Sequence, residues 1–197
     1  MIGIILAAGF SRRMGKNKLI LPFKNNTIIE SVIKETMASK LEEIYIVCQE
    51  GKVKDIGSKY SINIILNKRA NEGQSTSIVE ALRQIEDINK YDSFMFLMGD
   101  QPLINKDFLN EMINFYYDNK YSILVPVYNS KRGTPVIFSS TWREKLLDLK
   151  GDEGGRQIIK KYGEEVSEYN VDSELLGVDI DNLEDYNKVL NIDKAMK

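Results

Sequence analysis

Short apolar runs rich in β-branched residues alternate with segments of helical periodicity through the first half of the chain. Strands that are separated by helices of roughly ten residues predict βαβ units, and therefore a mostly parallel sheet with helices on both faces. The expected strands are Ile2–Leu6, Ile44–Cys48, Ile62–Leu66 and Ser93–Met98, and the expected helices are Ile28–Met37, Val53–Tyr60, Ser77–Ile88 and Lys106–Asp118. Asn105 is the expected N-cap of the last helix. The pattern predicts a Rossmann-like, three-layer α/β/α fold, which binds ligands at the carboxyl ends of its strands.

The pattern changes after Tyr121. Two further strands, Ser122–Val127 and Pro135–Phe138, flank the turn Asn129–Gly133 and predict a hairpin. The remaining expected elements are helices at 141–149, 156–161 and 182–191 and a strand at 166–170. Since no linker or internal repeat interrupts the chain, we expect one α/β domain over residues 1–197.

The chain contains no histidine and a single cysteine, Cys48. These counts exclude a disulfide framework, a Cys/His zinc or haem site and every mechanism with a histidine base. What remains is carboxylate, lysine, arginine and hydroxyl chemistry, for which Mg²⁺ is a natural metal partner. Cys48 lies in the middle of an expected strand and is interpreted as a small core residue.

The formal net charge is −2, so no overall positive field attracts nucleic acid or an anionic membrane. We therefore expect neither as a partner, and any anionic ligand must meet a local cluster of positive groups. The apolar run Ile2–Ala8 is short and lacks a basic leader, and no window approaches the ~18 apolar residues that cross a bilayer. The expectation is a soluble cytoplasmic protein.

The loop after the first strand combines glycines with four positive side chains, Arg12, Arg13, Lys16 and Lys18. Small residues directly after a buried strand let the backbone approach a ligand, and successive N–H groups in such a turn can bind an anion. A solvated basic loop is the alternative interpretation. The position after the first strand of an α/β fold favours a triphosphate cradle.

Two better-known phosphate motifs do not match this loop. Gly9 and Gly15 are separated by five residues, and Asn17 occupies the place of the Walker A hydroxyl residue. The dinucleotide pattern GxGxxG is also missing. The motifs therefore predict neither a P-loop ATPase nor an NAD enzyme.

The same segment, LAAGFSRRMGKNK, resembles the LAAGxSxRMGxxK signature of the nucleotidyltransferases that act on molybdopterin. The resemblance implies the nucleotide-diphospho-sugar transferase type of fold, with Arg13 on the β- and γ-phosphates and Lys18 near the α-phosphate as catalytic groups. The nucleotide-binding residues that it implies are Leu6, Ala7, Ala8, Gly9, Ser11, Arg13, Lys18, Gly73 and Ser77. The last two lie in Asn71–Ser77, which resembles the family's GxxxS segment and by itself predicts helix capping by Ser75 or Ser77.

Two acidic motifs extend the resemblance. Gly99–Pro102 resembles the family's GDQP segment, which implies that Asp100 binds Mg²⁺ and acts in catalysis; alone, it reads as a capping aspartate. VDIDNLED resembles the family's DIDTPED close, and alternation along an extended chain points Asp179 and Asp181 to the same side. Asp181 is the preferred second metal ligand and Asp179 the lesser choice, with an acid-rich helix N-terminus as the alternative.

The acceptor side is implied by three segments of the same family. They are GDQP, the GHPV-like Gly133–Val136, in which threonine replaces histidine, and the GDxGxR-like Gly151–Arg156. The implied acceptor-binding residues are Gln101, Pro102, Gly133, Thr134, Pro135, Asp152 and Arg156. The part of the chain up to about residue 120 would then bind mainly the nucleotide, and the remainder mainly the acceptor.

The resemblance implies a Mg²⁺-dependent transfer of CMP from CTP to molybdopterin cofactor, with release of pyrophosphate. The form LAAG, rather than LAGG, favours CTP. A phosphate monoester is already largely a dianion at neutral pH, since its second pKa is ~6, so this nucleophile needs no general base. The alternatives are guanylyl transfer to the same cofactor, transfer to a sugar or alditol phosphate, and a non-catalytic chaperone that delivers cofactor to a molybdenum hydroxylase. A transient contact with such a hydroxylase is also expected.

Overall fold

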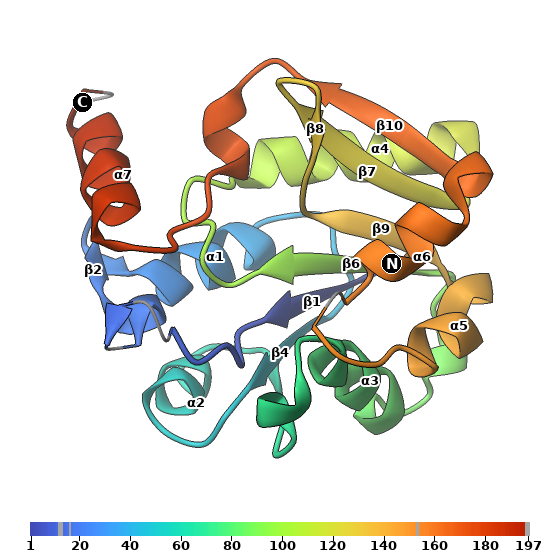
Figure 1. Cartoon of the computed structure of the whole chain (residues 1–197), viewed down its shortest axis with the longest axis horizontal. Helices are drawn as coiled ribbons and strands as arrows, with labels where there is room; N and C mark the ends of the chain where they lie inside the picture. Colours follow the sequence, from blue (N-terminus) through green and yellow to red (C-terminus); the bar gives the residue numbers. More distant parts are fainter. Residues whose placement is uncertain (12–13, 16, 153, 196–197) are drawn as a thin grey trace.

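A computed structural model describes residues 1–11, 14–15, 17–152 and 154–195 of the chain. Its central feature is an eight-stranded sheet in the order β10-β7-β9-β6-β1-β4-β5, with β8 paired to β7 (Figure 1). The strands are β1 (Ile2–Leu6), β4 (Ile44–Cys48), β5 (Asn63–Leu66), β6 (Ser93–Met98), β7 (Ile123–Tyr128), β8 (Lys131–Arg132), β9 (Val136–Ser139) and β10 (Val166–Val171). A separate two-stranded ribbon joins β2 (Pro22–Phe23) to β3 (Asn26–Thr27).

The half of the sheet formed by β6, β1, β4 and β5 is parallel, as the sequence predicts. β1 lies between β4 and β6 and runs parallel to both, and β4 runs parallel to β5. The expected hairpin is also present, because β9 pairs antiparallel with β7. β9 pairs antiparallel with β6 on its other side, and β10 adds to β7 in parallel. The hairpin therefore attaches the second half of the chain to the parallel half.

Helices cover both faces of the sheet and complete the three-layer α/β/α architecture (Figure 1). They are α1 (Ile28–Met37), α2 (Lys52–Gly57), α3 (Ser75–Gln84), α4 (Lys106–Asn119), α5 (Arg143–Leu147), α6 (Arg156–Lys161) and α7 (Leu183–Ala195). Buried residues of α1, α2, α4 and α7 share one apolar core, and those of α3, α5 and α6 share the other.

Strand β1 supplies side chains to both cores. Ile5 packs in the core under α1, whereas Ile2 and Ile4 pack in the core under α3, and all three are fully buried. This division follows from the alternation of side chains along a strand, and it explains why the run is apolar at successive positions. The carboxyl end of this doubly buried strand fixes where the following loop begins.

Helix bounds differ from expectation where glycine or short elements interrupt the pattern. α2 ends at Gly57, three residues before the expected Tyr60, and α3 begins at Ser75 and ends at Gln84. The β2–β3 ribbon was not predicted, because two-residue strands carry no readable period. In the part of the chain that the structure describes, no helix has both the length and the apolar character to cross a membrane.

Candidate active site

The loop after β1 begins with small buried residues and leads to Lys18. Ala7 and Ala8 are each 5% exposed, which keeps the backbone close to the end of the sheet. Ser11 has φ 49° and its Oγ accepts a hydrogen bond from the Lys18 N–H at 3.2 Å. This bond closes the loop between residues 11 and 18 and holds the backbone of Lys18 in place. Arg13, with Arg12 and Lys16, lies outside the described residues.

Lys18 joins the two acidic motifs. Its Nζ lies 2.6 Å from Asp100 Oδ2 and 3.1 Å from Asp181 Oδ1, and the Lys18 side chain is only 13% exposed. Burial acts to lower the pKa of Lys18, but the Asp100 and Asp181 carboxylates outweigh it and raise the pKa above its usual value. Lys18 is therefore a fixed positive charge between two carboxylates, and the interpretation of a solvated basic side chain is wrong for this residue.

Asp179 adds a third carboxyl group beside this pair. Desolvation of the Asp179 carboxyl, followed by the charges of Asp100 and Asp181, raises the pKa of Asp179 to about 6, although the residue as a whole is exposed. A hydrogen bond with the Gln101 side chain acts in the opposite direction. Three acidic groups from two distant segments therefore repel one another, and a cation at this place would relieve the repulsion.

The carboxylates fit a hard divalent cation by their chemistry. Asp100 Oδ1 is buried and accepts no hydrogen bond from the described residues, so one ligand oxygen is available. Carboxylate oxygens are the ligands that Mg²⁺ and Mn²⁺ prefer. Within the described ranges, however, no three acidic, histidine or cysteine side chains are gathered closely enough to form a ready metal cluster. Lys18 occupies the space between Asp100 and Asp181 instead.

The capping alternative is wrong for Asp100, whereas the acid-rich helix N-terminus is present at the second motif, because Glu184 and Asp185 lie in the first turn of α7. α4 is capped by Asn105, whose Oδ1 accepts from the Phe108 N–H, so Asp100 does not cap it. At the start of α7, Asn182 Oδ1 accepts from the N–H groups of Glu184 and Asp185. Asp181 lies before this cap and lines two cavities.

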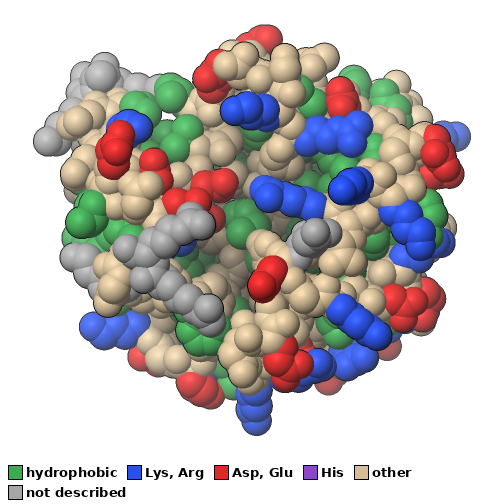
Figure 2. All heavy atoms as spheres, viewed as in Figure 1, with side chains coloured by type: hydrophobic (Ala, Val, Ile, Leu, Met, Phe, Trp, Pro, Cys, Tyr) green, Lys and Arg blue, Asp and Glu red, His purple; other side chains and the backbone are tan. Residues whose placement is uncertain are grey.

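These two cavities adjoin at the carboxyl ends of β1 and β6. The loop cavity, of about 550 Å³, is lined by Leu6, Ala8, Gly9, Phe10, Ser11, Lys18, Ala70, Asn71, Gly73, Gln74, Ser77, Met98, Asp152 and Asp181. The hairpin cavity, of about 540 Å³, is lined by the same Leu6, Gln74, Met98 and Asp181 together with residues of β6, the β8–β9 connection and α6. Figure 2 shows this face of the molecule hollowed near its middle, with acidic and basic side chains on opposite sides of the hollow.

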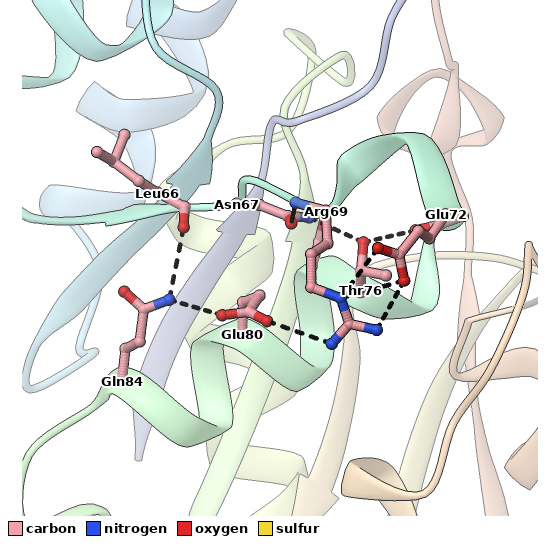
Figure 3. A network of polar contacts seen from close by, with 9 residues as sticks. Leu66, Asn67, Arg69, Glu72, Thr76, Glu80 and Gln84 are labelled. Atoms are coloured by element: carbon pink, nitrogen blue, oxygen red, sulfur yellow. Dashed lines mark hydrogen bonds and ion pairs between the residues drawn. The ribbon is translucent and has the colours of Figure 1, made fainter.

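The segment between β5 and α3 forms one wall of the loop cavity and is held by a polar network (Figure 3). Asn67 Nδ2 donates to Thr76 Oγ1 at 2.9 Å and to Ser77 Oγ at 3.0 Å. Arg69 pairs with Glu72 at 2.7 Å. The N-cap of α3 is Gln74 without a side-chain capping bond, so the expected capping by Ser75 or Ser77 is wrong. No local pattern points to Asn67, because its partners come from the next helix.

Gly73 touches the opposite wall of the loop cavity. Its φ is 119°, and a Cβ at this position would lie 2.5 Å from Gly151 O and 2.9 Å from Asp152 Oδ1. The Ser75 N–H also donates to Gly151 O at 3.1 Å. Asp152, expected on the acceptor side, therefore lines the loop cavity beside the nucleotide-side residues.

The other expected acceptor residues divide into two groups. Gly133, Thr134 and Arg156 line the hairpin cavity. Gln101 is 2% exposed and is not among the residues that line the hairpin cavity. Pro102 lines a different cavity, together with Phe23. Pro135 is buried and follows Thr134 through a cis peptide bond. The structure therefore does not bring all seven residues to one surface.

The residues of the hairpin cavity that were not predicted include two phenylalanines and two basic residues. Phe96 and Phe138 meet edge to face, with ring centroids 6.0 Å apart, and form part of the apolar lining. Lys160 and Arg132 join Arg156 as cationic side chains, and Arg132 is also paired with Glu168 at 2.7 Å. Arg132 directly precedes the Gly133 motif, which was the available signal, whereas the phenylalanines read as ordinary strand residues. The cavity thus combines apolar rings, cationic groups and the carboxylates of Asp100, Asp179 and Asp181.

Comparison with known proteins gives evidence that is independent of this geometry. Residues 3–166 match the MobA-like NTP transferase domain. The chain is 32% identical over 169 residues to the purine catabolism protein PucB of Bacillus subtilis, covering 81% of this chain and 80% of that protein. It is 28% identical to a probable molybdenum cofactor guanylyltransferase of Thermococcus sibiricus, covering 76% and 72%. It is also 25% identical to the molybdenum cofactor cytidylyltransferase of Escherichia coli, covering 93% and 92%.

A solved structure supports the fold. The structure of an Rv0371c homologue from Mycobacterium sp. strain JC1 superposes with a TM-score of 0.85 at 24% identity, covering 100% of this chain and 98% of that one. At this identity the likeness concerns the fold, which agrees with the Rossmann-like expectation.

Proposed function

We propose, from the premise that the chain belongs to the family of MobA-like NTP transferases, that it transfers CMP from CTP to molybdopterin cofactor and releases pyrophosphate. The observation that carries the proposal is the position of Lys18 Nζ between Asp100 and Asp181, where the two cavities adjoin. One cavity can then hold the triphosphate and the other the acceptor, with the charged groups at the boundary. The name of the Escherichia coli relative supports the choice of reaction.

The chain's own residues need to neutralise negative charge on the phosphates rather than remove a proton. In the proposed reaction a terminal phosphate of the acceptor attacks the α-phosphorus, and pyrophosphate leaves. This nucleophile is largely a dianion at neutral pH, since its second pKa is ~6, which agrees with a chain that contains no histidine. Lys18 would place its charge near the α-phosphate, and Arg13, outside the described residues, would hold the β- and γ-phosphates. Such preorganised charges typically contribute ~10²–10³ in rate each.

Mg²⁺ is the proposed metal, with Asp100 and Asp181 as its ligands and Asp179 as the lesser choice. When bound, it would neutralise charge on the phosphates. The support from the chain is the buried, unpaired Oδ1 of Asp100 and the mutual repulsion of the three carboxyl groups. A binding site for the metal requires Lys18 to leave the space between Asp100 and Asp181, and an incoming triphosphate offers Lys18 an alternative anionic partner.

Ala8 supports the choice of a cytosine nucleotide. The residue lines the loop cavity at the end of β1 and is 5% exposed. A smaller residue there would leave more room for a purine. Ala8→Gly is therefore expected to lower the preference for CTP over GTP, measured as the ratio of kcat/KM values. Guanylyl transfer is the second candidate, and the name of the Thermococcus relative favours it.

The acceptor is assigned to the hairpin cavity. Phe96 and Phe138 suit a flat ring system, and Arg132, Arg156 and Lys160 suit an anionic group. This combination favours molybdopterin over a sugar or alditol phosphate, which lacks the flat ring. The division of the chain into a mainly nucleotide-binding first part and a mainly acceptor-binding second part stays a proposal, in which Asp152 lines the loop cavity and Phe96 lines the hairpin cavity. Delivery of the product to a molybdenum hydroxylase is part of the same proposal.

The proposal is tested by incubating the protein with each nucleoside triphosphate, Mg²⁺ and molybdopterin cofactor, and by measuring pyrophosphate. CTP should support the fastest release, and mass spectrometry should find the cytosine dinucleotide of the cofactor. Faster turnover with GTP would replace the cytidylyl assignment by the guanylyl one. Tight binding of the cofactor without turnover of any triphosphate would instead favour a chaperone.

A further inference from the structure

Gln101 is buried and connects three separate segments. It directly follows Asp100 and is 2% exposed. Its Nε2 donates to Gly177 O at 3.3 Å, and its Oε1 accepts from Thr134 Oγ1 at 2.9 Å. Both ends of the amide are thus engaged with protein groups. Gln101 is also not among the residues that line the hairpin cavity, so its amide serves the surrounding segments rather than the cavity surface.

Tyr128, the last residue of β7, contacts the same two segments that Gln101 connects. Its hydroxyl donates to Thr134 O at 2.8 Å, and the residue is 8% exposed. The ring lies against two glycines, because a Cβ on either Gly133 or Gly177 would lie 2.7 Å from a ring carbon. A residue with any side chain at position 177 would therefore push the ring and the 177–181 segment apart.

The held segment is the one that carries the second acidic motif. The Ile180 N–H donates to Asp100 O at 3.2 Å, so the backbone of residues 177–181 is fastened to the Asp100 turn at two points. Asp179 and Asp181 stand on either side of Ile180, which is fully buried. Because no regular strand or helix covers positions 178–181, isolated hydrogen bonds and packing contacts hold these carboxylates in place, and the Gln101 side chain supplies one of those bonds.

We propose that Gln101 and Tyr128 are positioning residues that hold segment 177–181, and with it Asp179 and Asp181, opposite Asp100. This inference rests on the proposed function, since it assigns these carboxylates to the metal. It changes the role assigned to Gln101 from binding the acceptor to positioning the metal ligands. It also gives Thr134 two contacts, one with the hairpin cavity and one with Gln101. Outer partners of this kind typically change metal affinity ~10–100-fold when they are replaced.

The test measures Mn²⁺ binding directly, by electron paramagnetic resonance of the CTP-saturated protein with a CTP-only blank. Gln101→Met keeps the side-chain length but removes both amide bonds, and it should weaken Mn²⁺ binding about 10–100-fold. Thr134→Val should act in the same direction, whereas Thr134→Ser retains the hydroxyl and should restore wild-type affinity. In the pyrophosphate assay the loss should appear mainly as a raised KM for Mg²⁺, with a smaller change in kcat.

A second pair of variants does not depend on the amide. Gly177→Ala should displace the acidic segment from Tyr128 and weaken Mn²⁺ binding. The matched control is Gly163→Ala, because no described atom lies within 4 Å of its Cβ position. Tyr128→Phe has Tyr117→Phe as its control, because the Tyr117 hydroxyl donates to Asp92, at the opposite end of β6 from Asp100.

The outcomes separate the two claims. Wild-type protein that binds Mn²⁺ and turns over with Mg²⁺, while Gln101→Met, Thr134→Val and Gly177→Ala bind Mn²⁺ equally well, would overturn the positioning role alone. Wild-type protein that neither binds Mn²⁺ nor releases pyrophosphate would overturn the proposed function and this inference with it. Weakened binding in these variants, with thermal unfolding above the assay temperature and unchanged controls, is the expected result.

Discussion

Gly73→Ala is expected to destabilise the protein and to separate the two walls of the loop cavity. Gly73 has φ 119° and ψ 166°, a conformation that is essentially restricted to glycine and costs about 1–3 kcal/mol for another residue. The added Cβ would also lie 2.5 Å from Gly151 O. This is well below an ordinary contact, which is roughly 3.5 Å between heavy atoms. Overpacking of this kind typically adds about 1–3 kcal/mol.

Gly51→Ala is the control that separates backbone strain from steric overlap. Gly51 has φ 116° and ψ −155°, so alanine meets a similar backbone strain there. No described atom lies within 4 Å of its Cβ position, so the steric contribution is missing. With about 2 kcal/mol of strain, Tm should fall by roughly 4–8 °C in a chain of this length. The Tm of Gly73→Ala should fall further, by about 2–4 °C for each additional kcal/mol of destabilisation.

The two variants should also differ in nucleotide binding. Separation of Gly73 from Gly151 breaks the Ser75 N–H bond to Gly151 O and widens the loop cavity. Gly73→Ala should therefore raise the KM for CTP, while Gly51→Ala should leave it unchanged. The assays are thermal unfolding by circular dichroism and pyrophosphate release as a function of CTP. Equal Tm and equal KM in both variants would refute the close contact between the two walls and its role in the nucleotide cavity.

Three further predictions concern the scaffold. Thr27→Ala removes the N-cap of α1 and should cost about 1 kcal/mol, or roughly 2–4 °C in Tm; an unchanged Tm would contradict the capping contribution. Burial raises the pKa of the Cys48 thiol to about 11, so a thiol reagent at pH 8 should label it only after unfolding, and labelling of native protein at the rate of a free thiol would disprove this. Tyr91 and Lys90 beside Glu43 lower its pKa to about 2, from 4.5. Because the folded-state pKa is depressed, the stability from Glu43 is complete above pH ~4.5 and is lost as the pH falls toward 2. The difference in Tm between wild type and Glu43→Gln should shrink across that window, and a constant difference would exclude the linkage.

The sequence predicted the elements whose apolar period and burial agree. β1, α1, β4, β6 and α6 have the expected bounds, because each is a buried run or an amphipathic segment with clear ends. α1 begins after Thr27, which forms a capping box with Glu30. The bounds of α2 and α3 were wrong where a glycine or an uncapped turn ended the helix. The position of β9 between β6 and β7 depends on long-range pairing, which no local pattern contains.

The site was predictable where one motif supplies one residue at the end of a strand. The structure brings Lys18, Asp100 and Asp181 together, although 163 positions separate the first from the last. Neighbours within a motif were less predictable, because successive residues of a turn point in different directions. Gln101 is buried behind Asp100, and Pro102 faces another cavity. The roles assigned to all these residues remain proposals for mutagenesis to test.

The most direct measurement of the central claim compares pyrophosphate release by wild type, Asp100→Asn and Lys18→Met, with CTP, molybdopterin cofactor and saturating Mg²⁺. Both substitutions nearly preserve shape while removing one charge from the Lys18–Asp100 pair, whose atoms lie 2.6 Å apart. Wild-type turnover should require Mg²⁺ and stop with EDTA, and each variant should lose about 10²–10³ in kcat while remaining folded. Turnover by either variant at close to the wild-type rate, or wild-type activity that survives EDTA, would contradict the account.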